Sequence, residues 1–374
     1  MTKNIFVLGA AGRIGRGVTH ELVSQISEDS SKGTYNLNLV GLSDIVTLDD
    51  LIDNYTGRDP VHGIYKWAVG KRVDEQDSRV RLMFQSGTGS MPHYFCEKDV
   101  SKIPFKKLEV DIILDCTGIF GDPKTIDKPT KEQNLSRKFL EYGVQTIIQT
   151  YPVKSADAML IMGVNHDLYN PEKHKIISNA SCTTKSLAVP LQVMEDNGIH
   201  VEDCRMVTVH AATASQKILE SLGQIVTHST GAAKATGEVM PSLKGKMGGT
   251  SARVPTLDGS ISYMYLVAES SDHLSLNSDE LNEIMKHAVN NPRYAGRLGI
   301  LESETKEKTI TSSDIINRKE NALIIPDETQ VRKLPYEINS RNVYHITLVS
   351  GYDNELGSSV DPVLLANYVS RKTK

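Results

Sequence analysis

The sequence predicts an α/β protein of two domains, the first built on a doubly wound parallel sheet. The chain has 374 residues, enough for two domains with a large core. Near its start, a short apolar strand over residues 4–8 leads into a glycine-rich turn and then into a helical pattern of apolar residues. Two later apolar runs, 110–120 and 144–152, end in small or hydroxylated residues. Such endings are expected where a parallel sheet presents the carboxyl ends of its strands to a ligand.

Composition excludes several classes of protein. The net charge of −4 gives no indication of a nucleic-acid partner or of binding to an anionic membrane. The four cysteines lack C-x-x-C spacing and are too sparse for a disulfide scaffold, which indicates a reducing compartment. No apolar run approaches the roughly 18 residues that span a bilayer, and the N-terminus shows no leader pattern. We therefore expect a soluble cytoplasmic protein without a nucleic-acid or membrane partner and without a metal site.

The turn at residues 9–16, G-A-A-G-R-I-G-R, is typical of a phosphate-binding turn. Glycine at Gly9, Gly12 and Gly15 allows the backbone to approach a pyrophosphate, and the amino end of the following helix attracts its charge. The spacing is G-x-x-G-x-x-G rather than G-x-G-x-x-G, so the turn alone also fits an ordinary glycine-rich loop.

An acidic residue completes the dinucleotide pattern. Asp44 closes the next apolar strand, where a carboxylate accepts hydrogen bonds from the adenosine ribose and repels a 2′-phosphate. This favours NAD over NADP, although Asp44 could simply end a strand. The polar stretch 27–36 explains the long gap from Gly15 as a surface insertion. Thr117 and Gly118, in the turn after a later strand, either flank the nicotinamide or form an ordinary turn.

A cysteine lies at the junction of a strand and a helix in S-N-A-S-C-T-T, residues 178–184. Ser181 is a plausible N-cap, which places Cys182 in the first helical turn. There the helix dipole and the unpaired N–H groups stabilise a thiolate. The sequence therefore predicts a nucleophile, and the alternative is a small core cysteine packed under a helix.

Other polar residues of the second half could serve that cysteine. His210 ends a β-branched strand and is a candidate general base, although a lone histidine is more often structural. Thr230 and Gly231 lie in an anion-friendly cluster, and Arg253 is either a phosphate or carboxylate clamp or a surface ion-pair partner. Asn354 lies in a polar turn before a C-terminal helical pattern at 360–369.

A series of motifs, in order along nearly the whole chain, resembles the glyceraldehyde-3-phosphate dehydrogenase family. They are G-R-I-G-R (12–16), D-x-x-H-G (59–63), C-T-G-I-F (116–120), M-G-V-N-H (162–166), S-N-A-S-C-T-T (178–184), T-V-H-A-x-T-A-x-Q-K (208–217), S-T-G-A-A-K-A (229–235), R-V-P-T (253–256) and Y-D-N-E-x-G (352–357). The resemblance implies NAD as the cofactor and an α+β catalytic domain with a mostly antiparallel sheet. The expected division is an NAD-binding domain over 1–181, a catalytic domain over 182–351, and a C-terminal helix within 352–374 that packs back on the first domain.

The resemblance also implies roles for matched residues. Cys182 is similar to the family's nucleophile and His210 to its catalytic histidine. The other matches are cofactor contacts at Arg13, Ile14, Asp44, Thr117 and Asn354, anchors for the substrate's phosphate at Thr213 and Arg253, and an inorganic-phosphate site at Ser181, Thr183, Thr230 and Gly231.

Several positions depart from the family pattern. The family's T-T-N-C is here T-T-K-S, residues 183–186, so that Lys185 and Ser186 differ, and the second glycine of its N-G-F-G turn is replaced. The connection after Lys217 is shorter and lacks the family's phosphate-site arginine, for which Lys185 or Lys217 could substitute. Lys185 could equally be a solvated helix residue. The charged segment 303–345 is longer than the family expects. Family members are tetramers, and the short connection makes a dimer an alternative for this homo-oligomer.

The implied reaction is NAD-dependent oxidative phosphorylation of an aldehyde. Glyceraldehyde 3-phosphate would react through a thiohemiacetal and a thioester at Cys182, giving 1,3-bisphosphoglycerate. An imidazolium at His210 would pair with the thiolate, so the two groups should titrate together. The same chemistry on a different phosphorylated or anionic aldehyde, and a catalytically silent binding or regulatory protein, are the alternatives that the sequence leaves open.

Overall fold

The computed structural model describes residues 2–28, 35–63, 67–74, 79–84, 89–212, 223–270, 276–303, 305 and 309–373. The chain divides into two compact units. The first unit comprises residues 1–160, 167–180 and 358–374, and the second comprises 161–166 and 181–357. Residues 352–357, which the sequence division assigned to the C-terminal segment, belong to the second unit. The predicted insertion at 27–36 lies largely outside the described residues.

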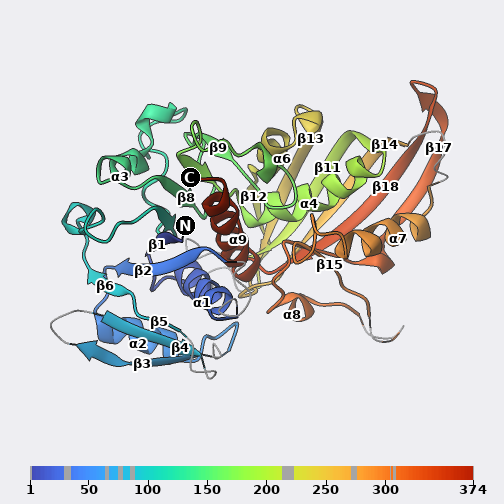
Figure 1. Ribbon diagram of the computed structural model, residues 1–374. Helices are drawn as coiled ribbons and strands as arrows, with labels where there is room; N and C mark the ends of the chain where they lie inside the picture. Colours follow the sequence, from blue (N-terminus) through green and yellow to red (C-terminus); the bar gives the residue numbers. More distant parts are fainter. Residues whose placement is uncertain are drawn as a thin grey trace. The chain divides into compact units, whose positions relative to one another are not determined.

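The first unit is built on a mainly parallel sheet (Figure 1). Its strands are β1 (Lys3–Leu8), β2 (Leu37–Asp44), β3 (Trp67–Asp74), β4 (Arg79–Phe84), β5 (Gly89–Ser90), β6 (His93–Cys96), β7 (Ile112–Asp115), β8 (Thr146–Gln149), β9 (Ala158–Met159) and β10 (Ile176–Ser178). The strand order is β3-β4-β6-β2-β1-β7-β8-β10-β9, with β5 on β4. β1 pairs in parallel with β2 on one side and with β7 on the other. The chain therefore winds outward from β1 in both directions, which confirms the predicted doubly wound sheet.

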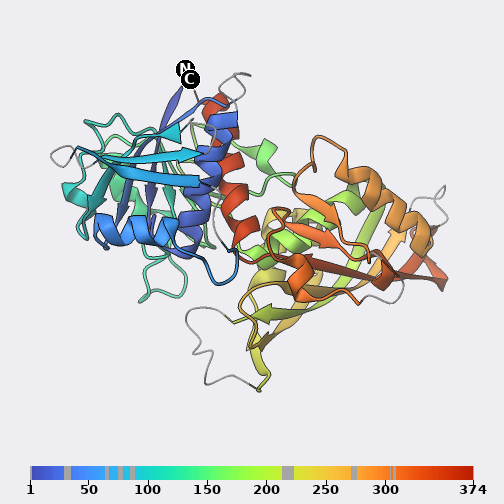
Figure 2. The same cartoon turned by 90° about the horizontal axis from the view of Figure 1, so that it is seen from below.

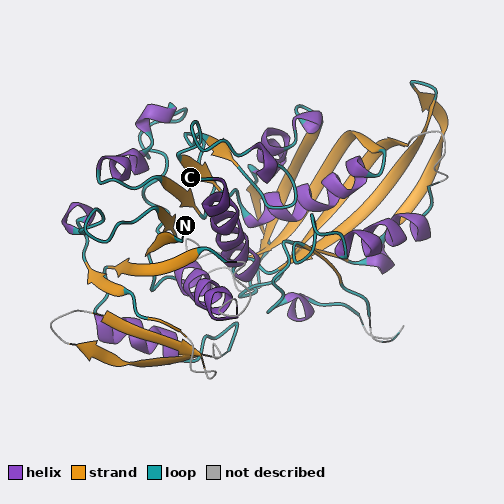
Figure 3. Cartoon of the chain, in the orientation of Figure 1, coloured by secondary structure: helices purple, strands orange, loops and turns teal. Residues whose placement is uncertain are grey.

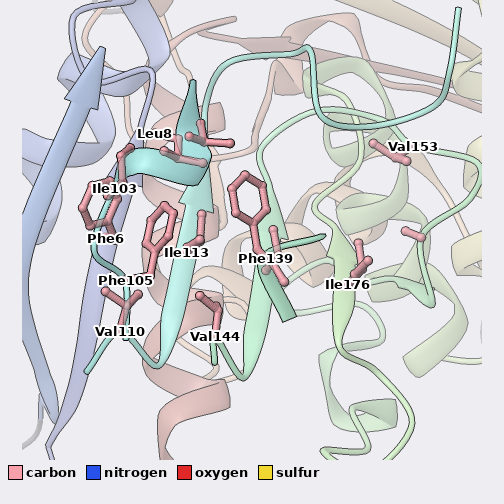
Figure 4. Close-up of a cluster of buried hydrophobic side chains, with 13 residues drawn as sticks. Phe6, Leu8, Ile103, Phe105, Val110, Ile113, Phe139, Val144, Val153 and Ile176 are labelled. Atoms are coloured by element: carbon pink, nitrogen blue, oxygen red, sulfur yellow. The ribbon is translucent and has the colours of Figure 1, made fainter. Parts of the chain in front are cut away.

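Aromatic side chains form the centre of the core beside this sheet (Figure 4). The ring of Phe105 meets Phe6 and Phe139 edge-on, with centroids 5.1 and 5.7 Å apart. Such pairs add to the stabilisation from burying apolar area. Ile113 of β7 and Ile176 of β10 belong to the same cluster, so one core supports the strands whose carboxyl ends carry the polar turns described below.

The helices of the first unit are α1 (Arg13–Glu28), α2 (Leu48–Thr56), α3 (Lys138–Glu141) and most of α9 (Leu356–Lys372). Helix α9 lies beside α1 in both views of the chain (Figures 1 and 2). The Ser359 hydroxyl donates to the Ile14 carbonyl at 3.4 Å, and a Cβ at Gly17 would overlap the Ser359 side chain. The Asn179 amide donates to Asp361 of α9 at 2.6 Å. The C-terminal helix thus supports the turn that follows β10.

The second unit is built on a mostly antiparallel sheet, as expected from the resemblance. Its strands are β11 (Ile199–Ala211), β12 (Val226–Ser229), β13 (Met247–Val254), β14 (Ser260–Ser270), β15 (Leu298–Ile300), β16 (Ala322–Ile324), β17 (Gln330–Ile338) and β18 (Arg341–Tyr352). They follow the order β12-β13-β11-β14-β18-β16-β15, with β17 on β18. Among the described strand pairs of this second sheet, only β11–β13 and β15–β16 are parallel. Helices α4 (Cys182–Asp196), α6 (Ala232–Val239), α7 (Ser278–Val289) and α8 (Ser312–Ile315) belong to the same unit (Figure 3).

Two segments differ from the simple patterns in the sequence. β11 runs from Ile199 to Ala211, one residue beyond the predicted strand end at His210, and its register with β14 shifts between Val201 and Asp203. This irregularity breaks the alternation of buried and exposed residues. Within the charged segment 303–345, β17 and β18 form a hairpin whose turn residues Asn339 and Ser340 have φ angles of 54° and 61°. That conformation suits a two-residue hairpin turn.

Short 3₁₀ turns occupy residues 100–102, 131–133, 135–137, 166–168, 241–243 and 326–328. Among the described residues, no helix combines the length and the apolarity that crossing a bilayer requires.

Candidate active site

A tight turn presents Cys182 at the amino end of α4. Ala180, which precedes the N-cap, has a φ of 58°, a left-handed conformation that is costly for a residue with a Cβ. Ser181 caps the helix, because its hydroxyl accepts the Thr184 N–H at 3.1 Å. The structure confirms the predicted N-cap and the place of Cys182 in the first turn. Its side chain is half-buried.

Cys182, His210 and Asn354 form a triangle of side chains. The Sγ atom of Cys182 lies 3.7 Å from Nε2 of His210 and 3.8 Å from Nδ2 of Asn354. Nδ2 of Asn354 lies 3.1 Å from Nε2 of His210. The sequence predicted each residue, but it did not predict that Asn354 contacts both of the others. We refer to these three residues as the catalytic triangle.

The hydrogen bonds of His210 assign its tautomer. Nδ1 lies 2.7 Å from the carbonyl oxygen of Ala211, which can only accept, so Nδ1 carries the hydrogen. In the neutral ring Nε2 is then the acceptor, and it receives the Asn354 amide and faces the sulfur of Cys182. The ring is therefore oriented to take a proton from Cys182.

Burial opposes a charge on either member of this pair. Burial, reinforced by the positive charge of Arg253, lowers the pKa of His210 to about 4, although the bond to Ala211 acts in the opposite direction. Burial raises the pKa of the Cys182 thiol above its ordinary value, while the charge of Lys185 and hydrogen bonds from Thr183 and Asn354 oppose this rise. A thiolate or an imidazolium formed alone is thus costly, and the pair is favoured only when both charges form together.

The amide of Asn354 is held in one orientation. Its Oδ1 accepts the Ser260 hydroxyl at 2.8 Å, which leaves Nδ2 directed at His210 and Cys182. The Asn354 backbone N–H donates to Asp258 at 2.8 Å, and Ser260 in turn accepts the Ala211 N–H at 3.0 Å. Sequence reasoning missed Ser260 and Asp258, and the polar stretch T-L-D-G-S at 256–260 was the available signal.

A chain of hydroxyl groups fastens the first turn of α4 to the sheet. The Tyr352 hydroxyl lies 2.9 Å from the hydroxyl of Thr183 and 2.8 Å from that of Thr208. All three side chains are buried, and burial raises the pKa of Tyr352. Thr183 was predicted as a phosphate contact, and the structure places it as a buried residue, 5% exposed, whose hydroxyl lies beside that of Tyr352. Tyr352 and Thr208 were missed although they lie within the quoted motifs.

We predict that Tyr352→Phe destabilises the protein without abolishing catalysis. The substitution leaves the buried hydroxyls of Thr183 and Thr208 without their shared partner, which costs about 1–3 kcal/mol. The free energy of unfolding in urea measures the loss. Tyr265→Phe is the control, because Tyr265 lies on the same sheet and is 42% exposed. Equal unfolding free energies for both variants would contradict the role given to the hydroxyl chain.

The second unit holds several candidate anion-binding groups, of which Arg253 lies beside His210. Arg253 is the register partner of His210 across β11 and β13, and its Nη1 donates to the Ala211 carbonyl at 3.3 Å. Its buried Nε has no hydrogen-bond partner among the described residues, as expected of a donor kept for an anion. Gly231 is the N-cap residue of α6, and the Thr230 hydroxyl accepts the Ala232 N–H at 3.2 Å. Thr213 and Lys217 lie outside the described residues.

Lys185 follows Cys182 by three residues on α4, so the two side chains lie on the same face of the helix. Its side chain is only 1% exposed, which is rare for lysine. Its positive charge favours the thiolate form of Cys182. The sequence left open whether Lys185 is a solvated helix residue, and its burial excludes that alternative.

A cavity of about 460 Å³ lies at the carboxyl edge of the parallel sheet in the first unit. Gly9, Gly12, Asp44 and Thr117, which were predicted from the sequence as cofactor contacts, line it. Asp44 accepts the Ala11 N–H at 2.8 Å and so holds the glycine turn against β2. A Cβ at Gly15 would overlap the Gly9 carbonyl, which explains why this position in the first turn of α1 is glycine.

The cavity also contains groups that the sequence did not indicate. Glu97 and Lys98 line it beside Asp44, because β6 runs parallel to β2 and ends next to it. Glu97, whose carboxylate forms an ion pair with Lys102 at 3.7 Å, adds a second acid beside Asp44 that would repel a 2′-phosphate. Three features of the site fit a dinucleotide that lacks a 2′-phosphate. They are the glycine turn, the amino end of the long helix α1 and the carboxylate of Asp44. Arg13 and Ile14 lie in the first turn of α1, and Gly118 has a φ of 70° in the turn after β7.

Comparison with known protein families matches both halves of the chain. Residues 4–123 match the family described as "Glyceraldehyde 3-phosphate dehydrogenase, NAD binding domain", and residues 181–354 match "Glyceraldehyde 3-phosphate dehydrogenase, C-terminal domain". Among curated relatives, glyceraldehyde-3-phosphate dehydrogenase 1 of Saccharomyces cerevisiae is 31% identical over 372 residues, covering 96% of this chain and 97% of the relative. The enzyme of the same name from Chlamydia trachomatis is 31% identical over 98% of this chain and 99% of the relative. That of Borreliella burgdorferi is 32% identical over 86% and 91%.

Proposed function

The chain belongs to the glyceraldehyde-3-phosphate dehydrogenase family, and we propose that it oxidises glyceraldehyde 3-phosphate with NAD and passes the acyl group to inorganic phosphate. The main structural support for this proposal is the catalytic triangle of Cys182, His210 and Asn354. It joins a sulfur nucleophile, a base and an amide donor at the start of a helix. The residues lining the cavity of the first unit would hold NAD.

Cys182 becomes a nucleophile by transferring its proton to Nε2 of His210. The two atoms are 3.7 Å apart, and Nε2 is the acceptor of the neutral ring. Since burial disfavours either charge alone, the thiolate and the imidazolium form as a pair, further favoured by the positive end of α4. The amide of Asn354, which contacts both groups, orients them for the transfer.

The thiolate attacks the aldehyde carbon and forms a thiohemiacetal. The backbone N–H of Cys182 has no acceptor within the helix and is available to stabilise the oxyanion, to which His210 returns its proton. NAD, when bound, accepts the hydride from the substrate carbon. His210 removes the hydroxyl proton in the same step, leaving a thioester on Cys182. Inorganic phosphate then attacks the thioester carbon, and the Cys182 thiolate leaves.

Two anions must be held, the substrate's own phosphate and inorganic phosphate. We assign the first to Arg253, whose buried Nε lacks a partner among the described residues, together with Thr213. We assign the second to Ser181, Thr183, Thr230 and Gly231, where the amino ends of α4 and α6 supply backbone donors. Both sets belong to the unit that carries Cys182.

An assay with and without phosphate tests the acyl-phosphate route. We expect NADH formation from glyceraldehyde 3-phosphate to stop after one turnover per site when phosphate and arsenate are omitted, because the thioester then has no acceptor except water. Undiminished steady-state NADH formation without either anion would contradict the proposal.

The presence of Lys185 supports a second candidate function, in which the same reaction is carried out on a different anionic aldehyde. A buried cation on the Cys182 face of α4 is a departure from the family pattern and changes the charge near the reacting carbon. A panel of phosphorylated and carboxylated aldehydes, compared by kcat/KM, separates the two candidates. The higher kcat/KM identifies the substrate.

We predict that Lys185→Met lowers the reactivity of Cys182. Removing the nearby positive charge raises the thiol pKa further, so the rate of iodoacetamide alkylation at pH 7 should fall about threefold to tenfold. Lys244→Met, at an exposed lysine of the same unit, is the control and should leave the rate unchanged. The proposed role of Lys185 fails if both variants alkylate like the wild type.

We further propose that the enzyme is a cytoplasmic homo-oligomer, either a tetramer or a dimer. Its four cysteines are all free, which suits a reducing compartment. Light scattering of the purified protein separates the two oligomeric states.

A further inference from the structure

A buried carboxylate is hydrogen-bonded to Thr117, which lines the cavity of the first unit. Asp115 is the last residue of β7 and is completely buried. Its Oδ1 accepts both the backbone N–H of Thr117 at 2.9 Å and the Thr117 hydroxyl at 2.6 Å. Its Oδ2 accepts the Tyr151 hydroxyl at 2.5 Å. Three donors from two segments of the chain therefore converge on one carboxyl group.

The surroundings of Asp115 supply hydrogen bonds, and the charge of Lys138 acts on it only weakly, behind those bonds. Among the described residues, no lysine or arginine forms an ion pair with it. Burial raises the pKa of Asp115, and the hydrogen bonds from Thr117 and Tyr151 act against that rise. A carboxyl group in such a place is costly unless its acceptor sites are satisfied. Loss of the Tyr151 donor would leave Oδ2 unsatisfied.

These bonds determine the shape of the turn that lines the cavity. Because the Thr117 hydroxyl donates to Asp115, its oxygen is left as an acceptor, which receives the Ile119 N–H at 3.2 Å. Gly118 between them has a left-handed φ of 70°. Thr117 and Ile119 both line the cavity. A Cβ at Gly9 would lie 3.1 Å from Thr117, so this turn also packs against the phosphate-binding turn.

Tyr151 is held by contacts that do not involve Thr117. It follows β8, which pairs in parallel with β7, and the neighbouring Thr150 donates its N–H to the Asp115 carbonyl at 3.0 Å. A Cβ at Gly121 would lie 3.0 Å from the Tyr151 ring, so the ring packs closely there. The side chain of Gln149, the last residue of β8, donates to the Phe120 carbonyl at 3.0 Å and so joins the segment around Gly121 to β8.

We propose that Asp115 and Tyr151 are positioning residues for the dinucleotide: together they hold the Thr117 turn in the shape that the cofactor requires. This inference rests on the proposed function of the same cavity. Neither residue lines the cavity as Thr117 does, so their effect is exerted through Thr117. Their substitution should weaken NAD binding while leaving the chemistry at Cys182 intact.

The test is the dissociation constant for NAD, measured by calorimetry on the full-length protein. Tyr151→Phe removes one hydroxyl and should raise this constant about threefold to tenfold, with a matching rise in KM for NAD and an unchanged kcat. Tyr169→Phe is the matched control, because Tyr169 is a buried tyrosine of the same unit whose hydroxyl has no partner among the described residues. It should bind NAD like the wild type.

A double-mutant cycle shows whether the effect passes through Asp115. Thr117→Val should also weaken NAD binding, and the variant with both substitutions should lose less than the product of the two single losses, because both remove donors from the same carboxyl group. An unchanged NAD dissociation constant in Tyr151→Phe, or strictly multiplicative losses, would overturn the inference. Iodoacetamide alkylation of Cys182 without NAD should be unaffected in all variants.

These measurements distinguish failure of the positioning role from failure of the proposed function. If the wild type binds NAD and oxidises the aldehyde while Tyr151→Phe binds NAD equally well, only the positioning role falls. If the wild type does not bind NAD, the proposed function falls and the positioning role with it.

Discussion

Replacing Cys182 with serine should lower kcat for aldehyde-dependent NADH formation by at least about 10³-fold. A hydroxyl beside His210 is far less acidic than a thiol, and an ester intermediate would form in place of the thioester. The N-cap bond from Thr184 to Ser181 does not involve the Cys182 side chain, so the fold of α4 should be retained. The measurement is the initial rate of NADH formation at saturating NAD and aldehyde.

Cys96→Ser is the matched control for this substitution. Cys96 is an exposed free cysteine of the other unit and takes no part in the catalytic triangle. Its replacement should leave kcat unchanged and keep the alkylation-sensitive activity. The assignment of the nucleophile collapses if Cys182→Ser works as fast as Cys96→Ser.

Replacing His210 with asparagine should lower kcat by about 10²- to 10⁴-fold, because the base of both proton transfers is lost. It should also change the pH dependence of Cys182 alkylation. Without the imidazolium, burial raises the pKa of the thiol above the ordinary value, and only the charge of Lys185 and the hydrogen bonds from Thr183 and Asn354 oppose that rise. Alkylation of Cys182 in the variant should then occur only at alkaline pH, whereas the wild type should react at neutral pH.

His200→Asn is the control, since His200 lies on the same strand but pairs with Glu195 at 3.1 Å. It should preserve both kcat and the pH profile of alkylation. A His210→Asn profile that superimposes on the His200→Asn profile would contradict the coupled proton transfer between Cys182 and His210.

The features that could be predicted from the sequence are those decided within a few neighbouring residues. The turn from β1 into α1 depends on glycines spaced along one short segment, and Gly15 is required by the adjacent Gly9 carbonyl. The N-cap at Ser181 is likewise local, so the place of Cys182 in the first turn of α4 followed from the residues on either side.

The contacts that complete the catalytic triangle could not be predicted in this way. Asn354 reaches Cys182 across 172 residues of chain. Its orientation depends on Ser260 and Asp258, which lie in a third segment. The resemblance indicated Asn354 as a cofactor contact, but only the packing of β18 beside β14 brings it to His210.

The buried polar groups of the first unit illustrate the same limit. Asp115 and Tyr151 meet because β7 and β8 are neighbours in the sheet, and nothing in the residues around either one indicates the other. Lys185 is a further case, because a lysine in a helical pattern is expected to be solvated, whereas here it is buried on the face of Cys182.

The proposed mechanism requires that the substrate's acyl group is carried on the sulfur of Cys182. Mass spectrometry of the protein mixed with glyceraldehyde 3-phosphate and NAD, without phosphate, tests this directly. We predict a thioester adduct on the peptide that contains Cys182, which disappears when phosphate is added. Turnover in the absence of any adduct at Cys182, or an adduct confined to another residue, would contradict the account.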